Sequence, residues 1–116
     1  MCAELNTLYN WLLYSMGFAV TSYNARMLSP PTYLFRRGGW ENREVCEAYA
    51  NYAYKAFCEF GKEVRCWFTF NEPIVEPENR YWHPIWYPQH HSFREAVVAQ
   101  YNISIAHALG VARYRA

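Results

Sequence analysis

The chain has 116 residues, of which 53% are hydrophobic and 18% are charged, and its formal net charge is +1. This composition fits one globular segment, residues 1–116, and excludes a disordered chain. Because it has neither a basic stripe nor an apolar run of membrane length, we expect no nucleic acid and no membrane as partners. The first residues lack the basic and apolar regions of a signal peptide, so a cytoplasmic setting is expected.

The first third of the chain predicts a helix, a short strand and a loop. Apolar residues recur at helical spacing over residues 4–16, which predicts a helix. Gly17 is expected to end it, because glycine readily adopts the left-handed conformation found at helix ends. Residues 18–23 are rich in β-formers and predict a strand. Two prolines and two glycines in residues 24–39 predict a long loop, with a short helical turn near Tyr33.

The middle of the chain predicts a second helix and a second strand. Asn42 is a good N-cap, and Gly61 is expected to close the helix that follows. Residues 64–71 mix β-branched and aromatic side chains, which predicts a strand. The apolar residues expected on one face of the helix are Val45, Tyr49, Tyr52, Ala53, Ala56, Phe57 and Phe60.

The last third predicts a loop and a long helix. Residues 72–91 hold four of the six prolines and are expected to form a loop. Ser92 and Glu95 make an S-x-x-E capping box, which opens a helix that ends near Tyr114. The order helix, strand, helix, strand, helix predicts an α/β fold with two parallel strands. Two strands are too few for an independently stable sheet, so the segment is expected to be one part of something larger.

Four cysteines stand at positions 2, 46, 58 and 66, and no Cys-x-x-Cys pair occurs among them. On a shared helix Cys46 and Cys58 would be about 18 Å apart, which is too far for a disulfide. We therefore expect all four to be reduced thiols that act as small apolar residues.

A set of motifs in fixed order carries a family resemblance. Residues 69–73 read T-F-N-E-P and close the second predicted strand. Before them stand G-G-W-x-N-R at 38–43, F-G at 60–61 and V-R-x-W at 64–67. With the pattern of residues 96–114, these motifs resemble glycoside hydrolase family 1 over nearly the whole chain, from the second barrel helix to the fourth.

The resemblance implies both a fold and an activity. The fold would be a segment of a (β/α)8 TIM barrel, in which active sites lie at the C-terminal ends of the strands. The activity would be that of a retaining β-glycosidase on β-glucosides, β-galactosides or their 6-phosphates, with no cofactor and no metal. Glu72 would be the catalytic acid/base, and Asn71 would bind the 2-hydroxyl of the sugar.

The chain departs from the family pattern in the loop after the first predicted strand. Counted back from Pro30, Arg26 stands where the family has a sugar-binding histidine, and Leu28 stands where it has an acidic residue. The change indicates either a different substrate group, such as an anionic one, or a decayed site.

A second departure concerns the nucleophile, which in the family lies in a T/I-E-N-G motif. These 116 residues do not contain that motif. Glu76 and Glu78 are too close to Glu72 along the chain to take the place of a carboxylate across the barrel. We therefore expect the isolated chain to be inactive.

Histidines in the proline-rich loop raise the question of a metal site. His83, His90 and His91 share that loop, but no carboxylate or cysteine completes a recognisable ligand spacing, so solvated histidines are favoured. His107 lies within the last predicted helix, and helix packing explains it better than catalysis.

Two tryptophans in the same loop have two readings. Trp82 and Trp86 would either form the wall of an aglycone subsite or cover an exposed edge of the barrel.

Two alternatives to an enzyme remain open at this point. One is a non-catalytic fragment that self-associates through open sheet edges or complements another barrel piece. The other is a sugar-binding module, which only the tryptophans favour.

Overall fold

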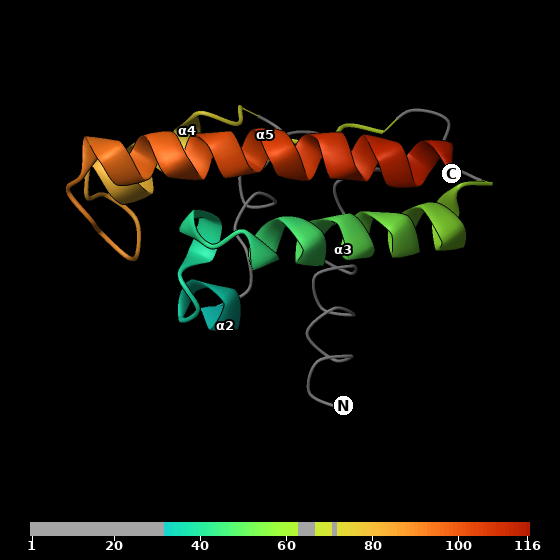
Figure 1. The fold of residues 1–116 in the computed structure, drawn as a ribbon, viewed down its shortest axis with the longest axis horizontal. Helices are drawn as coiled ribbons and strands as arrows, with labels where there is room; N and C mark the ends of the chain where they lie inside the picture. Colours follow the sequence, from blue (N-terminus) through green and yellow to red (C-terminus); the bar gives the residue numbers. More distant parts are fainter. Residues whose placement is uncertain (1–31, 63–66, 71) are drawn as a thin grey trace.

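The computed structural model describes residues 32–62, 67–70 and 72–116. Two long helices, α3 and α5, lie side by side along the longest axis of the molecule, and shorter helical turns surround their N-terminal ends (Figure 1). The elements in chain order are α2 (Thr32–Phe35), η2 (Gly39–Glu41), α3 (Glu44–Phe60), α4 (Val75–Pro77), η3 (Glu78–Trp82) and α5 (Phe93–Arg115).

The two long helices run in the same direction (Figure 1). Near the start of α3, the Cys46 thiol donates to the carbonyl oxygen of Asn102 at 3.2 Å. Near the end of α3, the Phe57 ring meets the Tyr114 ring edge-on, with centroids 5.1 Å apart. Because two parallel neighbours cannot be joined by a short turn, the chain must run back between them.

Residues 67–70 belong to this returning connection. Trp67 packs edge-on against Phe57 at 4.9 Å, and Phe70 stacks on Tyr49 at 4.5 Å. The eight residues of α3 between these two contacts rise by about 12 Å. Three steps of extended chain cover about 10 Å. The two lengths are similar, so residues 67–70 run antiparallel to α3, with a bend at Thr69.

The strand predicted for residues 64–71 is not confirmed. No strand forms in residues 67–70, which are part of the predicted stretch that the structure describes. Backbone hydrogen bonds to a neighbouring strand define a strand, and the Thr69 carbonyl instead accepts from the Tyr49 hydroxyl at 2.6 Å. The helix predicted at 4–16 and the strand predicted at 18–23 lie outside the described residues. The regular structure that is described is therefore all helical.

The ends of α3 follow the local signals in the sequence. Asn42 Oδ1 accepts from the backbone N–H of Glu44 at 3.0 Å, which satisfies one of the free donors at the helix start. At the other end, the Gly61 N–H donates to the Phe57 carbonyl at 2.9 Å, and the helix stops there. The predicted closing residue, Gly61, is confirmed. Arg43 directly precedes α3, and Asn42 caps the helix start from one residue before it.

The start of α5 also matches its signal, because Ser92 Oγ accepts from the backbone N–H of Glu95 at 3.3 Å. The turn expected near Tyr33 is present as α2. The loop predicted for residues 72–91 is wrong in part, since α4 and the π-helical turn η3 lie within it. Pro77 is the last residue of α4 and directly precedes η3. It is tolerated there because the N–H groups in the first turn of a helical stretch have no partner in the helix.

The core lies between α3 and α5 and is closed at one end by two aromatic residues from the short helices. Trp40 of η2 and Tyr81 of η3 are both fully buried. Of the predicted face of α3, Phe57 and Phe60 are only half-buried. The other five residues are buried as predicted, namely Val45, Tyr49, Tyr52, Ala53 and Ala56. Within the described residues, no helix is both long enough and apolar enough to cross a membrane.

Candidate functional site

The T-F-N-E-P segment is held from both long helices at Thr69. From α3, the Tyr49 hydroxyl donates to the Thr69 carbonyl at 2.6 Å. From α5, His107 Nδ1 lies 2.7 Å from Thr69 Oγ1. Burial raises the pKa of Tyr49, so its hydroxyl stays protonated and remains a donor. His107, expected only to pack within its helix, is exposed and joins α5 to this segment.

The next residue, Phe70, adds an apolar anchor. Its ring is stacked on Tyr49 with an interplanar angle of 23°, and it meets Trp40 edge-on at 5.7 Å. Aromatic pairs in these geometries stabilise by about 0.5–1.5 kcal/mol beyond the burial of their area. The polar and aromatic contacts together fix the chain just before the predicted site residues.

Glu72 stands exposed shortly before α4. Its φ of 44° is in the left-handed region, which is uncommon for a residue other than glycine. Its carbonyl accepts from the Val75 N–H at 2.9 Å, which closes a tight turn. Backbone strain of this kind is concentrated at functional sites. Asn71, the predicted sugar-binding residue, lies outside the described residues, as do Arg26 and Leu28.

A buried ion pair fixes the loop that follows Glu72. Glu76 and Arg80 are bonded to each other one helical turn apart, and they are only 1% and 7% exposed. Arg80 also donates to the Tyr87 carbonyl, and its guanidinium lies 4.5 Å from the Phe35 ring centroid and 5.4 Å from that of Trp86. Glu76 is thus engaged in holding the loop together. A buried carboxylate in this pairing is not available to a substrate.

The two tryptophans of the loop differ in their surroundings. Trp82 is 40% exposed, stacks on His83 at 4.7 Å and meets Phe93 edge-on at 5.1 Å. Trp86 is half-buried beside Arg80. An exposed ring such as that of Trp82 can stack on a sugar, and its use as a subsite wall stays a prediction.

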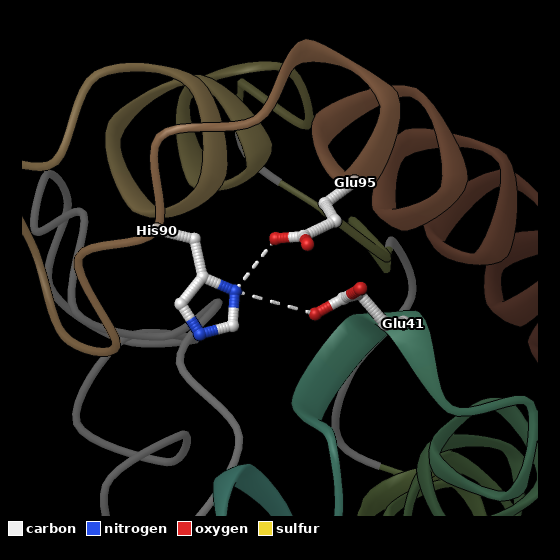
Figure 2. A group of neighbouring side chains, drawn as sticks. All are labelled: Glu41, His90 and Glu95. Atoms are coloured by element: carbon white, nitrogen blue, oxygen red, sulfur yellow. Dashed lines mark hydrogen bonds and ion pairs between the residues drawn. The ribbon is translucent and has the colours of Figure 1, made fainter.

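Sequence reasoning missed one group of side chains (Figure 2). His90 Nδ1 lies 2.7 Å from Glu95 Oε2 and 3.5 Å from Glu41 Oε2. The three loop histidines that were expected to be solvated, His83, His90 and His91, are all exposed, and His90 also has these two partners. Glu95 is only five residues from His90 in the sequence, so its proximity could have been predicted. Glu41 comes near His90 only through the fold.

Comparisons with known proteins agree with these motifs. The model of the family described as Glycosyl hydrolase family 1 matches residues 20–116. The chain is 42% identical over 85 residues to a 6-phospho-beta-glucosidase of Bacillus subtilis, covering 73% of this chain and 18% of that protein. It is 36% identical over 85 residues to 6-phospho-beta-galactosidase 1 of Streptococcus pneumoniae, covering 72% of this chain and 18% of that protein.

A plant relative aligns over more of the chain. Beta-glucosidase 1 of Oryza sativa is 33% identical over 117 residues, covering 92% of this chain and 23% of that protein. The chain thus spans about a fifth of the length of these curated relatives, between 18% and 23%. On the family match and these identities, the chain belongs to glycosyl hydrolase family 1.

Proposed function

We propose that the chain supplies the acid/base segment of a retaining β-glycosidase, with Glu72 as the catalytic acid and base. The relatives in this family are named for hydrolysis of β-glucosides, 6-phospho-β-glucosides and 6-phospho-β-galactosides. The substrate proposed for the complete protein is therefore a β-glucoside, a β-galactoside or one of their 6-phosphates.

The observation that carries the proposal is the way Glu72 is presented. It is exposed at a strained turn, directly after a segment that Tyr49 and His107 hold at Thr69. A general acid must stay within hydrogen-bond reach of the leaving oxygen, so its backbone needs such support. Glu72 would first protonate the leaving group and then activate the water that releases the sugar. Asn71 beside it would bind the 2-hydroxyl of the sugar.

The reaction also needs a nucleophilic carboxylate about 5–5.5 Å from the acid. Glu76 is buried against Arg80, so it does not meet this requirement. We therefore propose that the nucleophile comes from outside these 116 residues and that the chain alone does not turn over substrate.

The proposed fold is a segment of a TIM barrel with two parallel strands. Successive helices of such a barrel are parallel, and each strand runs opposite to the helix before it. The parallel pair of α3 and α5, with residues 67–70 running back along α3, supports this arrangement. The second of the two strands would extend from residues 67–70 once a neighbouring strand pairs with it.

A chimera tests the proposed activity. In the B. subtilis relative, the stretch that aligns with this chain would be replaced by this chain's residues. We expect the chimera to hydrolyse a nitrophenyl 6-phospho-β-glucoside, and Glu72→Gln to lower kcat by about 10²–10⁴. Glu78→Gln, a change on the same loop, is the control and should leave activity nearly unchanged. Loss of activity in the control but not in Glu72→Gln would reject Glu72 as the acid.

A second candidate function is that of a fragment that associates with itself or with another barrel piece. One observation favours it: Phe68, in the middle of the returning segment, is 84% exposed. A large apolar side chain at that level of exposure is a candidate for burial at an interface. Light scattering over a range of concentrations tests this candidate. A monomer with a sharp thermal transition that does not depend on concentration would reject it.

A further inference from the structure

The cluster of Glu41, His90 and Glu95 has no part in the proposed glycosidase chemistry. Glu41 comes from the end of η2, whereas His90 and Glu95 come from the loop after η3 and the first turn of α5, far along the chain from Glu41. Figure 2 shows one ring nitrogen of His90 facing both carboxylates.

We propose that this cluster binds one divalent transition-metal ion, with Zn²⁺ as the best match, through His90 Nδ1 and one carboxylate oxygen from each of Glu41 and Glu95. One imidazole nitrogen and two carboxylate oxygens form a ligand set that zinc accepts, and water would complete the coordination. A site with an imidazole ligand favours zinc over calcium or magnesium, which prefer oxygen ligands alone.

The distances fit this assignment. The ligand atoms of the three residues all lie within 4.8 Å of one another. Ligands bound at about 2.0–2.1 Å in a tetrahedron are roughly 3.4 Å apart. The separation of His90 Nδ1 from Glu41 Oε2 is 3.5 Å, which already matches. The 2.7 Å separation from Glu95 Oε2 would have to widen by less than 1 Å. These side chains are 28–43% exposed, which leaves room for that movement.

The backbone that carries the ligands is well anchored, so the site would be largely preformed. The His90 ring meets the buried Tyr81 ring edge-on at 5.7 Å, which orients the imidazole. Each ligand also has its backbone N–H bonded, Glu41 to the Gly38 carbonyl at 3.1 Å, His90 to the Arg80 carbonyl at 2.9 Å and Glu95 to Ser92 Oγ at 3.3 Å.

The charges of the cluster also favour a cation. Two carboxylates face one imidazole, and the guanidinium of Arg94 also acts on Glu41. Burial raises the pKa of Glu41, and the neighbouring Glu95 raises it further, while His90 and Arg94 act in the opposite direction. A divalent cation would relieve the repulsion between the carboxylates in a way that one proton on His90 cannot.

Isothermal titration of the 116-residue chain with ZnCl₂ at pH 7.5 tests the proposal. Cys58 is exposed and its thiol would bind zinc, so accessible thiols are alkylated first. We expect one equivalent of Zn²⁺ to bind, with an affinity that His90→Ala and Glu41→Gln each reduce by at least about tenfold. The matched controls are His83→Ala and His91→Ala on the same loop, which should bind as the parent does. Affinity should fall at pH 5.5, because protons compete for the ligands.

Circular dichroism of each variant shows whether α3 and α5 persist. If His90→Ala loses its helical signal, the isosteric Glu41→Gln decides the question. Parent-like zinc binding by Glu41→Gln would overturn the proposal. So would the absence of saturable binding by the parent.

Discussion

His107 Nδ1 lies 2.7 Å from Thr69 Oγ1, a contact that joins the last helix to the segment leading into Glu72. The carbonyl of Thr69 also accepts a hydrogen bond from the hydroxyl of Tyr49 on α3. The T-F-N-E-P segment is therefore tied to both long helices through one residue. The first prediction concerns this contact.

We expect Thr69→Val and His107→Ala to be coupled in a double-mutant cycle. The hydrogen bond is partly exposed, so the coupling energy should be about 0.5–1.5 kcal/mol in the free energy of unfolding. Urea denaturation of the parent, both single variants and the double variant measures it. A control cycle between Thr69→Val and Ser104→Ala, which also lies on α5, should show no coupling. Strictly additive effects of Thr69→Val and His107→Ala would show that the contact does not stabilise the fold.

Asn102 of α5 is expected to be a major determinant of stability. It is 5% exposed, and its side-chain amide donates to the carbonyls of Trp40 at 2.7 Å and Glu41 at 3.2 Å. Asn102→Ala leaves both carbonyls without this donor and should cost about 1–3 kcal/mol. Asn51→Ala, at an exposed position of α3, is the matched control and should cost less than about 0.5 kcal/mol. Equal urea midpoints for the two variants would contradict this assignment.

Gly39 should resist substitution more strongly than its neighbour Gly38. Both have a positive φ, at 55° and 102°. A Cβ at Gly39 would also lie 2.7 Å from the Tyr81 hydroxyl and 2.8 Å from the Phe35 ring, whereas the nearest atom to one at Gly38 is 3.3 Å away. Backbone strain alone costs about 1–3 kcal/mol. Thermal unfolding should therefore show a larger loss for Gly39→Ala than for Gly38→Ala, and the reverse order would be inconsistent with this packing.

The two cysteines of α3 should differ in reactivity. Cys46 is buried and burial raises its pKa, while Cys58 is exposed. Because the thiolate is the reactive form, a raised pKa and a covered sulfur both slow alkylation. Iodoacetamide at pH 8 should modify Cys58 first, and Cys46 only as fast as the chain unfolds. Mass spectrometry shows which cysteine is alkylated first. A disulfide between Cys46 and Cys58 in unreduced protein would contradict this prediction.

The cytoplasmic setting expected from the sequence stays a prediction.

Local signals in the sequence were enough to predict the two ends of α3 and the start of α5. Asn42 and Ser92 accept hydrogen bonds from N–H groups two and three residues further on, so the partner and the signal lie in the same short stretch. The apolar face of α3 was predicted for the same reason, since helical spacing relates neighbours in the sequence. The prolines of residues 72–91 misled, because Pro77 lies in the first turn of a helical stretch, where a missing N–H removes no hydrogen bond of the helix.

The contacts that depend on the whole fold could not be predicted in this way. A strand needs a partner, and the described residues 67–70 bond to side chains of α3 and α5 instead. Glu41 meets His90 only because η2 packs against the start of α5. The motif residues alone pointed to Glu72, and its exposed, strained turn agrees with the role proposed for it.

The dependence on the leaving group tests the role of Glu72 most directly. A good leaving group departs without protonation. The loss of a general acid therefore slows the hydrolysis only of substrates that have a poor leaving group. In the chimera with the B. subtilis relative, kcat/KM would be measured for methyl and dinitrophenyl 6-phospho-β-glucosides. We predict that Glu72→Gln lowers the value for the methyl glycoside by about 10²–10⁴ and the value for the dinitrophenyl glycoside far less. An equal loss on both substrates, or no loss on either, would contradict the assignment of Glu72 as the acid.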